Sequence, residues 1–186
     1  PIHVSMGLVW ESAEITALKR YLQAVSHPNI HSLVTLSLPV QSIYGAHWSV
    51  TGKDVPVEGT PDEDVYLPGR NILLISVVGI WCSLNQVSTM AIGSLSCNPF
   101  PDGTPEFFQS FPAAVGQGLN HPLKVIAPYR GMEKIELIRR FRHLPFELTL
   151  TCMTPVDGRH CGRCGKCGER KQAFRDAGVK DPTQYG

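Results

Sequence analysis

The sequence predicts an α/β fold in which a Rossmann-like parallel sheet is flanked by helices. Short β-type segments alternate along the chain with helical patterns, which is typical of parallel strand pairing. Apolar residues make up 42% of the 186 residues and charged residues 18%, so there is material for a core. Four cysteines gather near the C-terminus and predict a smaller lobe. We therefore expect an α/β domain over residues 1–150 and a zinc-binding lobe over residues 151–186.

The first part of the chain has the pattern of strand, helix and strand. Residues 2–5 alternate between apolar and polar, and apolar residues recur every three or four positions over residues 13–25. Residues 33–38 predict a second strand, closed by Pro39. Residues 41–68 are rich in glycine, proline and charge and predict a long surface loop.

The middle of the chain continues this alternation. Residues 71–90 are mostly apolar and predict a helix enclosed in the core, followed by a short buried strand at 91–95. After a loop, a further helix begins at Glu106. Residues 123–127 predict the last strand, and residues 132–143 predict an amphipathic helix.

Charge and hydropathy argue against two classes of partner. Seventeen Lys and Arg residues against sixteen Asp and Glu residues give a formal charge of +1, so no global field attracts nucleic acid or an anionic membrane. The longest apolar run, residues 72–84, is too short to span a bilayer. The chain opens without a recognisable signal peptide, and its cysteines are clustered rather than spread, so we expect a cytoplasmic location.

The strongest chemical signal is the cysteine pattern Cys152-x8-Cys161-x2-Cys164-x2-Cys167. Structural zinc is held by four tetrahedral ligands, and a Cys-x2-Cys step lets two sulfurs turn back onto one ion. Four thiolates on Zn²⁺ leave a negative site, which the neighbouring Arg and Lys residues compensate. We expect one structural Zn²⁺ per chain, held by these four cysteines.

Other interpretations of the cluster fit less well. An iron–sulfur run usually has its fourth cysteine downstream, not nine residues upstream. Disulfides rarely join residues three apart on a tight turn. A catalytic zinc needs an open coordination position, which four cysteines do not leave. Cys82 and Cys97 lack ligand spacing and are expected to be ordinary buried thiols.

An ordered set of motifs surrounds the cysteines. Residues 67–71 (Leu-Pro-Gly-Arg-Asn) open the long apolar helix, residues 105–107 open the next, and residues 134–138 lie in the amphipathic helix. Residues 169–174 and 177–182 follow the cluster. In this order the motifs resemble the 7-cyano-7-deazaguanine synthase family of PP-loop ATP-using enzymes, over about residues 66–182.

The resemblance implies an ATP-dependent ligase and nitrile synthase. A 7-carboxy-7-deazaguanine-like carboxylate would be activated by ATP, converted with ammonia to the amide and then dehydrated to the nitrile, as in queuosine biosynthesis. ATP would be a co-substrate, with Mg²⁺. The family also implies a homodimer, and neither nucleic acid nor a membrane is expected as a partner.

The same resemblance assigns nucleotide- or substrate-binding residues, although it identifies no catalytic acid or base. Arg70 and Asn71 would lie at the nucleotide or substrate cleft, and Lys134 would face a phosphate. Each also has a simpler explanation, because helix ends commonly carry caps, dipole-favoured carboxylates and surface ion pairs. The full set of expected binding residues is Gly69, Arg70, Asn71, Gly93, Asp102, Glu106 and Lys134.

Two features depart from the family pattern. The pyrophosphate-binding sequence Ser-Gly-Gly-x-Asp-Ser does not occur in the 186 residues, and residues 5–11 resemble the turn after the second strand. We therefore expect the chain to be truncated, or else to be a remnant lacking the phosphate loop. The substrate loop, residues 93–102, shares only Pro101 and Asp102 with the family's Ser-Gly-Tyr-Pro-Asp-Cys stretch. A related carboxylate is therefore an alternative substrate.

Two other functions stay open on the sequence alone. One is a non-catalytic zinc-containing α/β domain that binds a partner. The other is a zinc-knuckle nucleic-acid module, suggested by the basic residues around the cysteines. Phe174 is the one aromatic residue of the Phe, Tyr or Trp type between Cys152 and Asp181, so bases have little to stack on.

Overall fold

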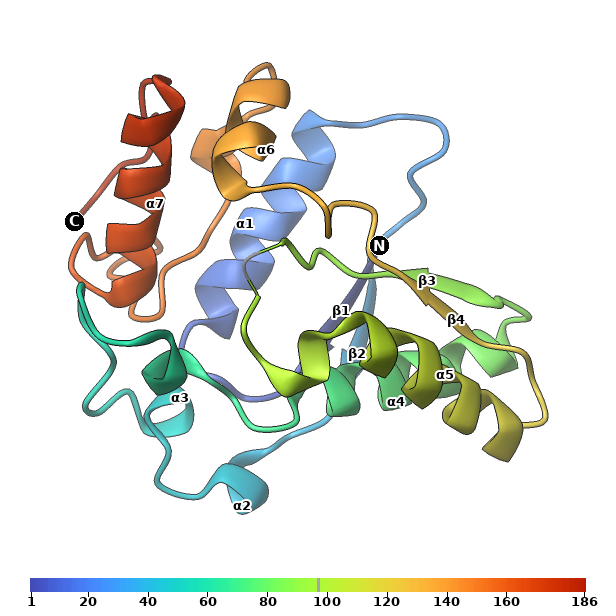
Figure 1. The fold of residues 1–186 in the computed structure, drawn as a ribbon. Coiled ribbons are helices and arrows are strands. Elements are labelled where there is room, and N and C mark those ends of the chain that lie inside the picture. Colours follow the sequence, from blue (N-terminus) through green and yellow to red (C-terminus); the bar gives the residue numbers. More distant parts are fainter. Residues whose placement is uncertain (97) are drawn as a thin grey trace. The chain divides into compact units, whose positions relative to one another are not determined.

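The computed structural model describes residues 1–96 and 98–186, so Cys97 lies outside the described residues. The chain forms two compact units, Pro1–Val65 with Ile135–Gly186, and Tyr66–Lys134. Each unit contains one pair of parallel strands flanked by helices (Figure 1). The predicted α/β class with parallel pairing is therefore confirmed, while a domain boundary at residue 150 stays a prediction.

The first unit begins with β1 (Ile2–Ser5), α1 (Glu11–Ala24) and β2 (Val34–Ser37), close to the predicted strand, helix and strand. β1 and β2 pair in parallel, with Ile2 opposite Val34 and Ser5 opposite Ser37. The pairing continues past the strands, because the Leu38 amide donates to the Ser5 carbonyl at 2.8 Å. The carboxyl ends of the two strands thus lie together.

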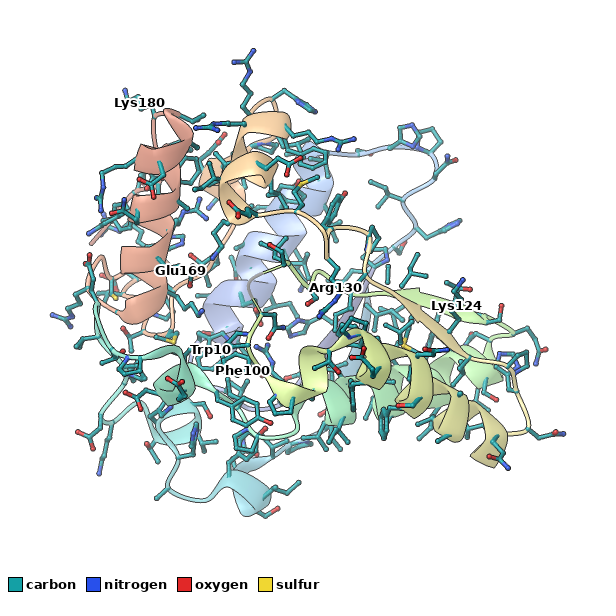
Figure 2. The ribbon with its side chains drawn as sticks, in the orientation of Figure 1. Trp10, Phe100, Lys124, Arg130, Glu169 and Lys180 are labelled. Atoms are coloured by element: carbon teal, nitrogen blue, oxygen red, sulfur yellow. The ribbon has the colours of Figure 1, made fainter. Side chains whose placement is uncertain are left out.

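The segment predicted as one long loop contains short helical turns. These are α2 (Gln41–Tyr44), α3 (Trp48–Thr51) and the 3₁₀ turn η1 (Asp62–Val65). Trp48 packs against buried Trp10 with ring centroids 5.7 Å apart, and its indole N–H donates to the Asp64 carbonyl at 3.1 Å. Figure 2 labels Trp10. Single turns carry no periodic apolar pattern, and the tertiary packing of Trp48 helps to hold them.

The first unit is completed by α6 (Lys134–Arg140), the 3₁₀ turn η3 (Phe146–Leu148) and α7 (Gly165–Ala177). The predicted amphipathic helix is real but shorter than residues 132–143. The guanidinium of Arg139 donates to the carbonyls of Ala177 and Asp176 at 3.0 and 2.8 Å. These carbonyls end α7, where a cation is favoured. Apolar side chains from the three elements form a shared core: Ile135, Ile138, Phe146, Ala173, Phe174 and Ala177.

The described residues of the second unit form three helical and two strand elements. They are α4 (Arg70–Leu84), β3 (Thr89–Ala91), the 3₁₀ turn η2 (Pro101–Gly103), α5 (Pro105–Gly118) and β4 (Lys124–Ile126). The prediction of a helix over residues 71–90 was wrong at its end. Gln86 has a φ of 57°, which a right-handed helix does not allow, and the chain then enters β3. β3 and β4 pair in parallel.

The long apolar helix packs into the core of its unit along one side. α4 buries Ile75, Gly79 and Cys82 along one stripe, and its other residues are partly or largely exposed. Glu63–Leu84 is long and apolar enough, by length and composition, to cross a membrane. Its continuous α-helix, however, covers Arg70–Leu84 alone, because Gly69 has a left-handed φ of 72°. Such a helix is about 22 Å long, against a hydrocarbon core of about 30 Å.

The turn after β1 is organised by one carboxylate. Glu11, in the first turn of α1, accepts hydrogen bonds from the Ser5 hydroxyl at 2.9 Å and from the amides of Met6 and Gly7 at 2.5 and 2.9 Å. Gly7 has a φ of 77°, and a Cβ there would lie 1.7 Å from the Gln41 amide nitrogen. Charge-assisted bonds from amides and a glycine-only conformation therefore fix this turn.

The Glu11→Gln substitution is expected to lower the free energy of unfolding by about 1–3 kcal/mol, because it removes the charge and turns an NH₂ group toward amide donors. Urea denaturation measures the change. Glu14→Gln in the same helical turn is the matched control, and its effect should stay within about 0.5 kcal/mol. Equal effects of the two substitutions would contradict this role for Glu11.

Candidate functional site

The four predicted metal ligands come together in the first unit. Cys152 follows η3, Cys161 precedes a tight turn, Cys164 is the N-cap of α7 and Cys167 lies in its first turn. Their sulfur atoms all lie within 4.8 Å of one another. The four residues are at most 7% exposed, and all are free cysteines. A chain segment of 16 residues therefore gathers four buried thiols at one point.

The spacing of the sulfurs fits a tetrahedral ion. The Sγ atoms of Cys161 and Cys167 are 4.0 Å apart and those of Cys152 and Cys164 are 3.9 Å apart. Four thiolates at about 2.3 Å from one zinc ion would be separated by about 3.8 Å. Backbone amides also point at the sulfurs: the Cys161 amide donates to Cys152 Sγ at 3.2 Å, and the Cys164 amide to Cys161 Sγ at 3.3 Å. The donor set suits a closed structural metal site.

The pKa values of the clustered thiols are shifted in opposite directions by the hydrogen bonds among their sulfur atoms. The hydrogen bond between the sulfur atoms of Cys164 and Cys152 lowers the pKa of Cys164 and raises the pKa of Cys152 to about 12. Burial lowers the pKa of neighbouring His160 to about 4, and its Nε2 accepts from the Thr151 amide at 3.1 Å. His160 is thus a neutral structural group rather than a further ligand in this arrangement.

The segment before η1 is attached to the cysteine cluster. Val57 forms a β-bridge with Cys164, and the Gly165 amide donates to the Pro56 carbonyl at 2.9 Å. The Glu58 amide donates to the Arg163 carbonyl at 3.2 Å. The sequence predicted this segment as part of a surface loop and gave no sign of the contact. The two parts lie about a hundred residues apart, and the backbone bonds that join them leave no sequence pattern.

A buried arginine holds the C-terminal tail beside the cluster. Arg170 on α7 is 6% exposed and donates to Thr183 Oγ1 at 2.6 Å, Thr149 Oγ1 at 2.9 Å and the Phe146 carbonyl at 2.8 Å. Asp181 lies 3.9 Å from the guanidinium. From the sequence, Arg170 was one of several cations that balance the thiolates. The structure gives it a further role in packing, because the buried guanidinium needs these acceptors.

In the second unit, two of the predicted ligand-binding residues bond to each other. Asp102 is 5% exposed, and its carboxylate accepts from the backbone amide of Asn71 at 2.9 Å. The Asn71 side chain donates in return to the Asp102 carbonyl at 2.9 Å. Gly69 is the N-cap of the same helix. Asp102 therefore caps α4 from a turn 31 residues away and holds the 101–103 segment against the helix end.

Two arginines belong to the same part of the second unit. The Arg130 guanidinium, labelled in Figure 2, donates to the Gly103 carbonyl. Arg130 was not among the predicted site residues. The Nε atom of Arg70 is buried and has no hydrogen-bond partner among the described residues. A buried donor without an acceptor costs about 1–3 kcal/mol, which a bound anion would recover.

The three remaining predicted ligand-binding residues are exposed or half-buried. Gly93 and Glu106 are exposed, and Glu106 lies in the first turn of α5, which the Thr104 hydroxyl caps by accepting from the Phe107 amide. Lys134 is half-buried at the first residue of α6. A ligand-binding role for these three residues stays a prediction.

The fold and the cysteine cluster together define a class: α/β proteins with parallel strands and a cluster of four cysteines near the C-terminus. The family model described as "Queuosine biosynthesis protein QueC" matches residues 7–178, and the chain belongs to this family.

Three relatives named 7-cyano-7-deazaguanine synthase illustrate the similarity. The protein of Methanothrix thermoacetophila is 30% identical over 99% of this chain and 86% of its own length. That of Syntrophobacter fumaroxidans is 32% identical over 82% of this chain and 72% of its own length. That of Anaeromyxobacter dehalogenans is 32% identical over 72% of this chain, and the match spans 58% of that relative. The family suggested by the motif order is therefore confirmed.

Purified protein is expected to contain about one zinc ion per chain and to be colourless. Cys161→Ser should abolish stoichiometric zinc and lower the thermal midpoint, because three thiolates leave the ion's coordination open and the lobe without its cross-link. Cys82→Ala, which removes a buried thiol of the second unit, should retain the zinc. Elemental analysis by mass spectrometry measures both. Stoichiometric iron with visible absorption would contradict the zinc assignment.

Asp102→Ala is expected to lower the free energy of unfolding by about 1–3 kcal/mol, because it uncovers the α4 amide that the carboxylate caps. Asp102→Asn keeps an acceptor oxygen in the same place and should lose less. Thermal or urea unfolding compares the two variants. If the alanine variant were as stable as the parent, Asp102 would not be the cap that holds this turn.

Proposed function

We propose that this protein is an ATP-dependent 7-cyano-7-deazaguanine synthase. Its substrate would be a 7-carboxy-7-deazaguanine-like carboxylate, and its products an amide and then a nitrile for queuosine or related deazapurine biosynthesis. The match to the QueC family over residues 7–178 carries this proposal, and the names of the curated relatives support it.

The chemistry proceeds in two activations. A carboxylate oxygen attacks the α-phosphate of ATP and displaces pyrophosphate, which gives an acyl adenylate. Ammonia then attacks the acyl carbon and AMP leaves with the former carboxylate oxygen, so the amide forms. A second ATP activates the amide oxygen in the same way, and loss of AMP with the amide protons leaves the nitrile. The enzyme must hold the reacting groups in line and keep water away from the adenylates.

We assign the binding of anionic groups to the N-terminal end of α4. The unpartnered, buried Nε of Arg70 supports this assignment, since a phosphate or carboxylate would supply the missing acceptor. Asp102 and Asn71 act as positioning residues, because each is engaged with the other and holds the neighbouring turn. Lys134, Gly93 and Glu106 are proposed to contribute further nucleotide or substrate contacts, and ATP is proposed to enter with Mg²⁺.

The four cysteines are proposed to hold one structural Zn²⁺. When bound, the ion would cross-link Cys152 to the start of α7 through metal–thiolate bonds. It would take no part in the reaction. The protein is further proposed to be a cytoplasmic homodimer. The 186 residues do not include the sequence Ser-Gly-Gly-x-Asp-Ser, so we propose that a pyrophosphate-binding loop preceding Pro1 completes the ATP site.

The proposal is tested by following AMP and pyrophosphate release in the presence of ATP, ammonia and 7-carboxy-7-deazaguanine. A form that carries the proposed pyrophosphate-binding loop before Pro1 is expected to turn over ATP only when the carboxylate is present. The 186-residue chain alone should not. If neither form consumes ATP in response to the carboxylate, the proposed reaction is wrong, and a role as a zinc-containing interaction domain is favoured.

Arg70→Gln in the active form is expected to reduce kcat/KM by about 100-fold, equivalent to about 2.7 kcal/mol, because the neutral side chain loses a charge-assisted contact to the anion. Arg142→Gln, at an exposed position after α6, is the control and should leave kcat/KM unchanged. Equal activity of the two variants would remove Arg70 from the proposed binding site.

A further inference from the structure

The segment that follows α7 turns back on the helix. Gly178, the C-cap of α7, has a left-handed φ of 65°, and the chain then runs back alongside the helix towards Gly186 (Figure 1). Residues 181–186, here called the clasp, are irregular apart from a β-bridge at Tyr185. Contacts with other parts of the first unit must therefore hold the clasp in place.

One buried cation anchors the clasp to α7. The guanidinium of Arg170 donates to Thr183 Oγ1 at 2.6 Å, and Asp181 lies 3.9 Å from it. The Asp181 carboxylate also accepts from the Tyr185 hydroxyl at 2.6 Å and from the Thr183 amide at 3.0 Å. These bonds fix the position of Tyr185 relative to the helix.

The far end of the clasp contacts the residues on both sides of Cys161. Tyr185 forms a parallel bridge with His160, and the Gly186 amide donates to the His160 carbonyl at 2.7 Å. On the other side of the cysteine, a Cβ built on Gly162 would lie 3.4 Å from the Cβ of Tyr185. The backbone that carries Cys161 is therefore covered by Tyr185.

A lysine joins the clasp to the same loop. The Lys171 ammonium lies 4.5 Å from the centroid of the Tyr185 ring and donates to the Gly162 carbonyl at 2.6 Å. A cation is attracted to the face of an aromatic ring, so Lys171 holds the ring against the loop that follows Cys161.

Cys161 is also the least buried of the four cysteines. Its exposed fraction is 7%, against at most 3% for the other three. A metal–thiolate bond is lost when water, a proton or a competing ligand reaches the sulfur. Because the clasp is bonded to the residues before and after Cys161, it lies across the most open approach to the cluster.

We propose that the clasp sets the rate at which the cysteine site releases its metal ion. In the closed arrangement, Tyr185 and the loop it contacts shield Cys161 from solvent. The clasp is held by a few hydrogen bonds and one ring contact, so it opens locally without unfolding of the unit. Cys161 is then the first ligand that a competing ligand displaces. The inference rests on the proposed Zn²⁺ and does not depend on the proposed reaction.

Zinc release is measured by mixing the zinc-loaded chain with the chromogenic chelator 4-(2-pyridylazo)resorcinol and following its absorbance. The release rate of the parent chain should become independent of chelator concentration, because opening of the clasp limits it. Tyr185→Ala is expected to keep about one zinc ion per chain but to release it about 10-fold faster, equivalent to about 1.4 kcal/mol. Gln184→Ala, at the exposed neighbouring position, should release zinc at the parent rate.

Two further variants separate the clasp from general stability. Glu11→Gln is expected to destabilise the same unit from the turn after β1, and it should release zinc at the parent rate. Tyr185→Phe keeps the ring and loses only the hydroxyl bond to Asp181, so it should fold and release zinc about threefold faster. It decides the question if Tyr185→Ala does not fold.

Release at the parent rate from both Tyr185 variants, or an equal acceleration by Glu11→Gln, overturns the proposal. A parent chain that contains no zinc also overturns it. Accelerated release from the Tyr185 variants supports the clasp even if no form of the protein consumes ATP in response to the carboxylate, and that result fails the proposed reaction alone.

Discussion

The convergence of four thiols on one point is the constraint on which the first unit depends. Their sulfurs lie within 4.8 Å of one another, and α7 begins at the third of them. The same helix then supplies Phe174 to the core and Arg170 to the tail network. The segment around Val57 joins the cluster through backbone bonds. An ion at this point would therefore stabilise contacts well beyond its own ligands.

The second unit is organised by side-chain hydrogen bonds, whereas the first unit is organised by its cysteine cluster. Asp102 satisfies an α4 amide, Asn71 returns a hydrogen bond, and Arg130 engages the Gly103 carbonyl. This shared network ties the residues that the family pattern connects with ligand binding to the start of a rigid helix. Sites supported in this way hold their geometry better than sites on free loops.

How much was predictable from the sequence depended on whether a pattern was local. The strand at residues 2–5, the helix after Glu11 and the clustering of the four cysteines follow from periodicity and spacing, and the structure agrees. The end of α4 was missed because an apolar run does not reveal a left-handed turn at Gln86. The Glu11 turn, the Arg170 network and the attachment of the Val57 segment were missed for a different reason. Each depends on polar or backbone contacts whose partners the sequence does not reveal.

The order of the two units along the chain has a consequence for synthesis. The second unit, Tyr66–Lys134, is inserted between the two segments of the first, Pro1–Val65 and Ile135–Gly186. On the ribosome, the inserted unit is complete before the second segment of the first unit has been synthesised. At that stage β1, α1 and β2 lack α6, η3 and α7. Residues 135–186, which bring all four cysteines, emerge after the inserted unit, so the first unit can close only once that unit has left the ribosome. A metal ion held by these cysteines would therefore join the chain after the inserted unit has emerged, and its supply would be a step in maturation.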